Sequence, residues 1–140
     1  MIWDEVTQAM VAALQADAQL VALLGDATRI FAMEEGVERR IPGVGYQLIY
    51  EAEEEVLNPI IVQIDYWAAK DGTTPARAQA ALLEQRIRRV LHHPIRRDFG
   101  GIEMATLFVE SRDMDDPKPG VIRRQLDFRF EPVKRRIIDT

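Results

Sequence analysis

His92 and His93 are the only two histidines in the sequence, and they are adjacent. Imidazole is a common metal ligand and a common general base in enzymes. Neighbouring side chains on a helix point about 100° apart, so this pair cannot easily share one metal ion. A metal site would also need carboxylates such as Asp98 from elsewhere. The pattern indicates a solvent-exposed helix end, where a partly protonated histidine is favourable against the helix dipole.

Two runs of carboxylates could hold a metal ion or take part in acid–base chemistry. The first run is Glu51, Glu53, Glu54 and Glu55, and the second is Asp113, Asp115 and Asp116. Neither run has the spacing of the twelve-residue calcium loop, with its alternating ligands and final glutamate. We interpret both runs as solvated loop charge, with a docking surface as the alternative.

Basic residues gather in three places along the chain. These are Arg39 and Arg40, then Arg86, Arg88, Arg89, Arg96 and Arg97, and finally Lys134, Arg135 and Arg136. Such patches can contact nucleic-acid phosphates. However, no aromatic residues alternate with them for base stacking, and the net charge of the chain is −5. The patches therefore favour salt bridges between subunits, or a solvated surface, over nucleic-acid binding.

Nucleophiles and cofactor motifs are scarce. The chain has no cysteine, which excludes disulfides, thiol chemistry and cysteine-ligated zinc. Ser111 is the only serine, and it falls inside a predicted strand. The sequence contains no phosphate loop, dinucleotide fingerprint or nucleophile elbow. We therefore expect no catalytic residue, no cofactor and no metal. Trp67, at the exit of a predicted strand, belongs either to the core or to an interface.

The chain is organised around a strand followed by a helix. Residues 60–67 alternate, with Val62, Ile64 and Tyr66 on one face and Gln63 and Asp65 on the other, as in a strand with one face in a core. The next helix is predicted to start at Pro75, capped by Thr73 or Thr74. It carries an apolar stripe through Leu83 and Ile87 and arginines on much of its opposite side.

The other elements flank this unit. A helix near residues 4–16 should break at Asp17, and a short second helix should end at Gly25. Strands are predicted at residues 29–33, 44–51, 102–112 and 121–131, the last closed by Pro132. The strands at 44–51 and 60–67 are expected to form one hairpin, and the last two strands another. The order α-α-β-β-β-α-β-β predicts an α+β fold, with a mainly antiparallel sheet of about four to five strands and helices packed on one face.

The length of 140 residues and the composition, 47% hydrophobic and 29% charged, are those of an ordinary globular protein. We predict a single domain over residues 1–132 and a short tail over residues 133–140. The first ten residues are acidic where a signal peptide would be basic, and no apolar run is long enough to span a bilayer. We therefore expect the protein to be made and kept in the cytoplasm of the cell that makes it, unless it is carried out within an assembly.

Taken together, these segments resemble the tail terminator, or tail completion, proteins of long-tailed bacteriophages, prophages and gene transfer agents. The resemblance lies in the leading helix pair ALQADAQLVALLGDATRIF, the segment RRIPGVGYQLI, the strand VQIDYWA, the helix ARAQAALLEQRIRRVL and the two closing strands. It covers most of the chain. The strand VQIDYWA followed by its helix is the most specific part.

The resemblance implies a structural virion protein and no enzyme. Such proteins form a ring, commonly a hexamer, on the head-proximal end of the tail tube, where they end tube polymerisation and provide the head–tail joining surface. The implied partners are other copies of the chain, the tail tube protein and a neck or head-completion protein. No membrane is involved, and DNA at most passes through the ring lumen. The implied location is the tail or neck of a virion assembled in the host bacterial cytoplasm.

Two alternatives stay open. One is another neck or head–tail connector protein, and the other is a small cytoplasmic enzyme or ligand-binding domain. A closed ring requires two different complementary patches on each subunit. We therefore expect acidic loops of one subunit to face basic patches of the next. The candidate interface residues are Arg39, Arg40, Glu53, Glu54, Glu55, Trp67, Arg88, Arg89, Asp115 and Asp116.

Overall fold

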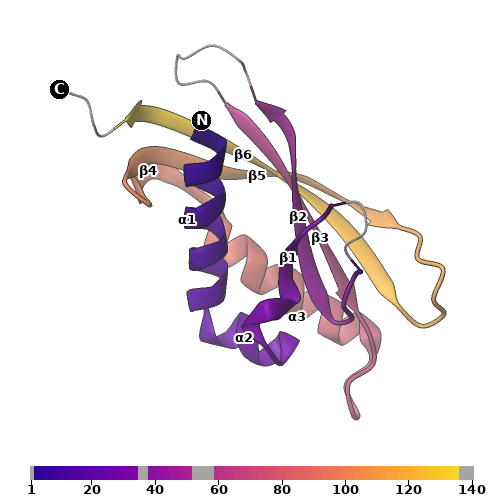
Figure 1. Ribbon diagram of the computed structural model, residues 1–140. Helices are drawn as coiled ribbons and strands as arrows, with labels where there is room; N and C mark the ends of the chain where they lie inside the picture. Colours follow the sequence, from indigo (N-terminus) through magenta and orange to yellow (C-terminus); the bar gives the residue numbers. More distant parts are fainter. Residues whose placement is uncertain (1, 35–37, 52–58, 136–140) are drawn as a thin grey trace.

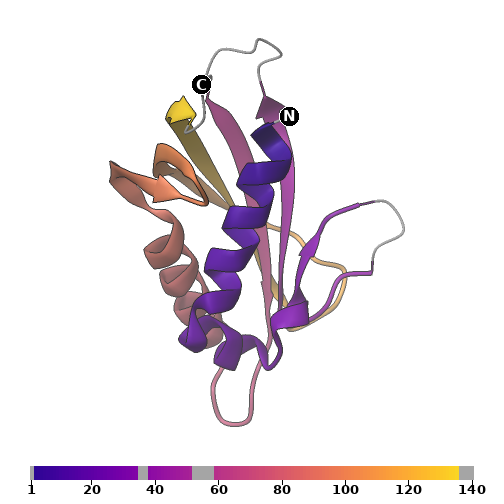
Figure 2. The same cartoon turned by 60° about the vertical axis from the view of Figure 1, so that its left-hand side comes forward.

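The computed structural model describes residues 2–34, 38–51 and 59–135. Its elements, in chain order, are α1 (Ile2–Ala16), α2 (Ala18–Leu24), a 3-10 turn η1 (Ala27–Arg29), β1 (Ile30–Ala32), β2 (Gly43–Glu51), β3 (Ile60–Ala68), α3 (Ala76–Leu91), β4 (His93–Phe99), β5 (Ile102–Met114) and β6 (Ile122–Arg135). The strands form one sheet in the order β1-β2-β3-β6-β5-β4. Figures 1 and 2 show the three helices on the same face of this sheet, which confirms the predicted α+β class.

The helix-covered face holds the core. Alternate residues of β3 point into it, and β6 contributes Leu126, Phe128 and Phe130 to the same layer. From the helices come Met10 and Leu14 of α1, Leu20 and Leu24 of α2, and Leu83, Ile87 and Leu91 of α3. The apolar stripes read from the sequence therefore meet in one layer between the helices and the sheet.

The break between α1 and α2 follows from two residues. Asp17 is the N-cap of α2, and its carboxylate accepts a hydrogen bond from the backbone N–H of Leu20 at 3.0 Å. Gly25 ends α2 in the left-handed region, with φ of 93°, which costs a glycine little. Both predictions are confirmed.

The start of α3 differs from the prediction. Pro75 is itself the N-cap, and no side chain caps the helix. Thr74 instead exchanges backbone hydrogen bonds with Asp71 at 2.8 and 2.9 Å. The predicted capping by Thr73 or Thr74 is therefore wrong, because the tight turn at Asp71–Thr74 occupies this segment.

The sheet has six strands where we expected four to five, and it is mixed. The unpredicted strand is β4, whose residues we had interpreted as a helix end and a turn. It is an edge strand that contains Pro94, and such strands are marked only weakly in a sequence. The parallel pair is β1 with β2, while all other pairs are antiparallel. The two predicted hairpins, β2–β3 and β5–β6, are confirmed.

Strand β6 continues through Pro132 to Arg135, although we expected Pro132 to end it. The last residue of β6 that pairs with β3 is Phe130, opposite Ile60. Beyond that point β6 pairs only with β5, so the missing N–H of Pro132 interrupts no ladder with β3.

The described part of the sheet has register shifts at four places. Two of them, between Leu48 and Tyr50 and between Phe108 and Glu110, adjoin the single row formed by Leu48, Val62, Phe128 and Phe108. Bulges of this kind bend and twist a strand. At the far edge, the β4–β5 turn reaches α1: a Cβ on Gly100, whose φ is +64°, would come within 2.4 Å of the Cβ of Ala9.

Candidate functional site

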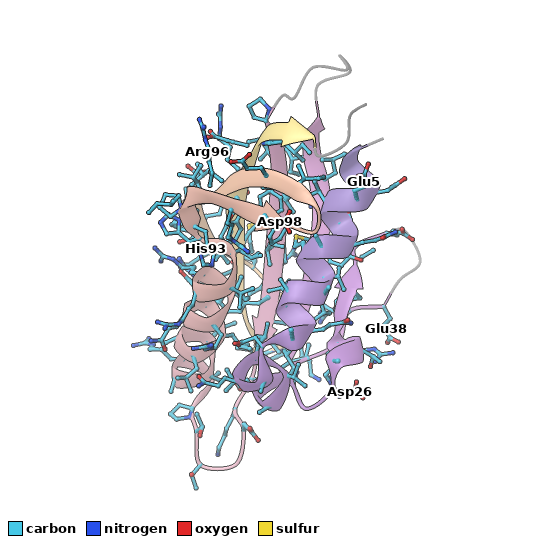
Figure 3. All side chains as sticks on the ribbon, turned by 90° about the vertical axis from the view of Figure 1, so that its left-hand side faces the viewer. Glu5, Asp26, Glu38, His93, Arg96 and Asp98 are labelled. Carbon is cyan, nitrogen blue, oxygen red and sulfur yellow. The ribbon has the colours of Figure 1, made fainter. Side chains whose placement is uncertain are left out.

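The two histidines lie in different surroundings. His92 caps the end of α3 and is exposed, and its Nδ1 accepts a hydrogen bond from the backbone N–H of Phe108 at 3.0 Å. His93 begins β4 (Figure 3), where burial, and secondly the nearby Arg97, lower its pKa. Among the described residues, no group of three or more histidines and carboxylates is placed to hold a metal ion.

The second acidic run is largely paired within the chain. Asp116 accepts a hydrogen bond from Arg39 at 3.0 Å, which joins the 113–120 loop to the segment before β2. Asp113 accepts one from Arg124 at 2.6 Å. Asp115 is exposed. Arg39 and this acidic run therefore already meet within one subunit, and the expected contact with a neighbouring subunit stays a prediction.

A charged cluster lies at one end of the helix-covered face. Glu84 of α3 accepts a hydrogen bond from the Tyr66 hydroxyl at 2.9 Å and another from Arg124 at 2.9 Å. Arg124 also donates to Ser111, the one serine of the chain. Burial, and secondly the bond to Glu84, raise the pKa of the Tyr66 hydroxyl. The cluster joins α3 to strands β3, β5 and β6 where the apolar core ends.

Beside this cluster is a groove between α3 and the β5–β6 hairpin, open to solvent and about 1080 Å³ in volume. Its apolar lining includes Ala80 and Ala81 from the helix and Val121 and Ile122 from the hairpin. Its charged lining consists of Arg77, Arg88, Arg89, Arg123 and Arg124, with Glu84 and Asp113. The groove is therefore predominantly basic over a partly apolar floor.

The opposite face of the sheet carries a network of polar side chains across four strands. Gln47 donates to Gln63 at 2.7 Å, and Gln63 donates to Asp127 at 3.1 Å. Arg112 donates to Asp127 at 2.9 Å and to Gln125 at 2.9 Å.

The same network reaches the fully buried Asp65. Gln125 donates to Asp65 at 3.1 Å, and Arg123 forms an ion pair with it at 2.6 Å. The carboxylate therefore has partners on the adjacent strand, as a buried charge needs. Acceptors and donors are matched along the network, so it can keep this face polar without leaving the buried members unpaired.

Trp67 lies at the end of this face, next to the network. Its side chain is only 2% exposed, and its ring stacks on that of Phe31 with centroids 5.8 Å apart. Arg123 lies over the same ring at 5.3 Å. The indole is thus covered within the chain. A contact between Trp67 and a partner stays a prediction.

The remaining candidate residues are distributed over the surface. Arg88 bonds to Glu84 at 3.3 Å and lies 3.9 Å above the ring of Phe108, while Arg89 is exposed. Arg40 is exposed and donates to the hydroxyl of Thr28 at 3.0 Å. Glu53, Glu54 and Glu55 lie outside the described residues. The structure thus brings Arg88 and Arg89 to one groove and leaves Arg40 elsewhere.

Sequence reasoning missed the groove and the cluster beside it. One signal was visible: Arg124 interrupts the apolar row of β6, and an arginine in such a row needs a carboxylate partner. The partner, Glu84, is 40 residues away in the chain. The sequence alone did not identify Glu84 as this partner, because its position on α3 is equally consistent with a solvent-exposed helix face.

Among the described residues, no single helix has the length and apolar character needed to cross a membrane, although the pair α1 and α2, bent by 80°, passes by length and composition alone.

The sequence matches no model of a known protein family and no curated protein. In three dimensions the chain is similar to a chain of a solved structure described as the virion of a native gene transfer agent particle. The superposition has a TM-score of 0.60 at 18% sequence identity and covers 88% of this chain and 90% of the other. At that identity the similarity shows that the two chains share a fold.

Proposed function

We propose that this chain is a structural protein of a phage-like virion, and that within the virion it is the tail terminator. In this role copies of the chain form a ring, commonly of six, on the head-proximal end of the tail tube. The ring ends tube polymerisation and offers its other side to a neck protein. The role requires no catalysis and no cofactor.

The observation that carries this proposal is the fold shared with a chain of a gene transfer agent particle. The match extends over 88% of this chain, so it involves the helix layer as well as the sheet. The sequence resemblance to tail terminator proteins, which include those of gene transfer agents, lies in the same helices and strands. The resemblance in residues and the similarity in backbone geometry therefore support the same proposal.

The distribution of charge supports assembly through unlike surfaces. A ring of identical subunits needs two different patches on each subunit that fit one another. The basic groove lies at the end of the sheet where β5 stops and β6 starts, and the acidic sequence 51–55 follows β2 at the other end. Figure 1 shows these strand ends on opposite sides of the molecule.

The first experiment is end-binding to purified tail tubes, observed by electron microscopy with labelled protein. We expect label at one end of each tube and tubes that stop growing when tube protein is added. Label along the tube wall, or none, would contradict the terminator role. A neck protein would bind tube ends only after the terminator had done so, which separates that alternative.

Light scattering gives an independent measure across a concentration series. A species about six times the 16.0 kDa chain mass is expected if the ring closes in solution. Because some such rings close only on a template, the tube experiment decides the function, and the scattering experiment decides where the ring forms.

A further inference from the structure

The groove between α3 and the β5–β6 hairpin has more positive charge than it can neutralise. Five arginines line it against two carboxylates, Glu84 and Asp113. Both carboxylates are already bonded to Arg124. Arg123 is bonded to Asp65 on the other side of the hairpin. Among the described residues, the groove therefore holds guanidinium groups that form no ion pair, beside an apolar floor, although the charge of Arg89 also acts on Asp17.

Those groups are Arg77 and Arg89. Both are exposed, and neither has an ion pair within 4.0 Å among the residues that the structure describes. They lie on α3 with Ala81 between them in the chain, and Ala81 is also exposed in the groove. A ligand for this surface must bring carboxylates to the helix and place small apolar groups between them.

Most acidic residues that lie near arginines in the described part of the chain already form ion pairs with them. Asp17 pairs with Arg86 at 2.6 Å, Asp65 with Arg123 at 2.6 Å, and Asp116 with Arg39 at 3.0 Å. The densest acidic sequence left is residues 51–55, with four glutamates in five positions, followed by Val56 and Leu57. Its composition, acidic and then apolar, complements a groove of arginines over alanine, valine and isoleucine.

The Arg77 end of the groove lies far from Glu51 of the same subunit. Glu51 pairs with Ile60 at the start of β3, whereas Tyr66, six positions further along that strand, lines the groove. Six steps along a strand span about 20 Å. The other end of the groove is nearer to Ile60, because Arg88 lies over Phe108, which is in the same row as Val62. We therefore place a contact that reaches Arg77 between two copies, arranged head to tail.

We infer that the groove formed by α3 and the β5–β6 hairpin binds the acidic sequence 51–55 of a second copy of this chain. Arg77 and Arg89 take the glutamates, and the apolar floor takes Val56 or Leu57. Because the two surfaces are unlike, repeating the contact gives a closed ring or a filament. The inference rests on the proposed function only in requiring that copies associate.

A charge exchange between two variants tests this contact. The first variant, Arg77→Glu with Arg89→Glu, makes the groove acidic. The second, Glu53→Lys with Glu54→Lys and Glu55→Lys, makes the sequence basic. Each variant alone places like charges in contact, so self-association by sedimentation velocity should weaken by about tenfold or more.

Mixing the two variants should restore association, because acidic grooves then meet basic sequences and basic grooves meet acidic ones in alternation. Arg96→Glu and Glu38→Lys are matched controls, since both residues are exposed and neither lines the groove. Variants that associate as well as the wild type, or a mixture no better than its parts, would overturn the inference.

Cysteine cross-linking measures the same contact even where association is weak. The chain has no cysteine, so only introduced thiols can form disulfides. The variant Glu54→Cys with Ala81→Cys should oxidise to a ladder of covalent oligomers, while each single variant should stay largely monomeric. A double variant that stays monomeric would overturn the inference.

The outcomes also separate this inference from the proposed function. Wild-type protein that binds tail-tube ends, together with no cross-linked ladder, would contradict the groove contact alone. A ladder in a protein that ignores tube ends would support the contact between copies and contradict the terminator role.

Discussion

The two faces of strand β3 are both largely buried but are stabilised in different ways. On the helix-covered face, β3 presents Val62, Ile64 and Tyr66 to an apolar core. On the other face the same strand presents Gln63, Asp65 and Trp67, and none of the helices in the described chain lies over it. Gln63, at 9% exposed, and Asp65, fully buried, are nevertheless nearly as inaccessible as the core residues.

The comparison shows that the alternation of apolar and polar residues along a strand predicts which face is polar, but it does not predict which face is buried. The core face gains stability from apolar area removed from water and from close packing. The polar face gains little per hydrogen bond, but removing one partner leaves a buried group unsatisfied. A substitution on the core face should therefore lower the free energy of unfolding because it leaves a cavity. A substitution on the polar face should lower it because a buried hydrogen-bonding partner is left unpaired.

The largest effect is expected on the core face. Phe128 is fully buried, and its ring meets that of Phe108 edge-on at 5.7 Å. Phe128→Ala should lower the free energy of unfolding by about 3–5 kcal/mol, through lost burial and a cavity. Urea unfolding followed by circular dichroism measures it. Ile95→Ala is the matched control, because Ile95 is 83% exposed and its truncation should change stability by less than about 0.5 kcal/mol.

An intermediate effect is expected on the polar face. Arg123→Ala leaves the Asp65 carboxylate buried with Gln125 as its main remaining partner. We expect a loss of about 2 kcal/mol, below the value for fully buried pairs, because the Arg123 side chain is 23% exposed.

The double variant Arg123→Ala with Asp65→Ala tests whether the loss comes from the uncompensated charge of Asp65. If an uncompensated charge causes the loss, the double variant should cost less than the sum of the two single variants, by about 1 kcal/mol or more. Simple additivity would mean that the polar face depends on packing as the core face does.

The smallest effect is expected at the join between α2 and α3, and it should depend on pH. The hydrogen bond from Arg86 holds the pKa of Asp17 below its ordinary value of 3.8, against the opposing effect of burial. A carboxylate whose pKa is lower in the folded state adds stability above 3.8 and loses it as the pH falls through the folded pKa.

Asp17→Asn keeps a capping side chain but removes the charge. It should cost about 0.5–1 kcal/mol at pH 7 and progressively less as the pH falls below 3.8. Thermal unfolding of both proteins across this range tests it. A difference that persists unchanged at low pH would assign the effect to the cap alone. Glu110→Gln is the control, because Glu110 is 62% exposed and should show almost no effect.

Much of the helix-covered layer could be predicted because its signals are local. Asp17 and Gly25 mark the break and end of the leading helices through their own hydrogen bonds and backbone freedom. Leu126, Phe128 and Phe130 alternate with polar residues in the sequence and lie in the core. These features depend on a few neighbouring residues and on period, which are visible in one dimension.

The candidate site could be predicted only in part. Arg88 and Arg89 were assigned to an exposed basic patch on α3, and both lie at the groove. Arg77 and the apolar floor were not identified, because the groove is defined by the distance between a helix and a hairpin. Arg39 and Asp116 were both assigned to subunit contacts, yet they pair with each other across 77 residues.

The sequence by itself determined the α+β class, the helix breaks, the two antiparallel hairpins and the polarity of each strand face. The tertiary structure alone decided the edge strand β4, the parallel pairing of β1 with β2, the partners of Arg124 and Asp65, and the groove. The physical reason is that local backbone preferences and apolar periodicity act over a few residues. Charge pairing and edge pairing depend on which distant segments the packed core brings within about 4 Å.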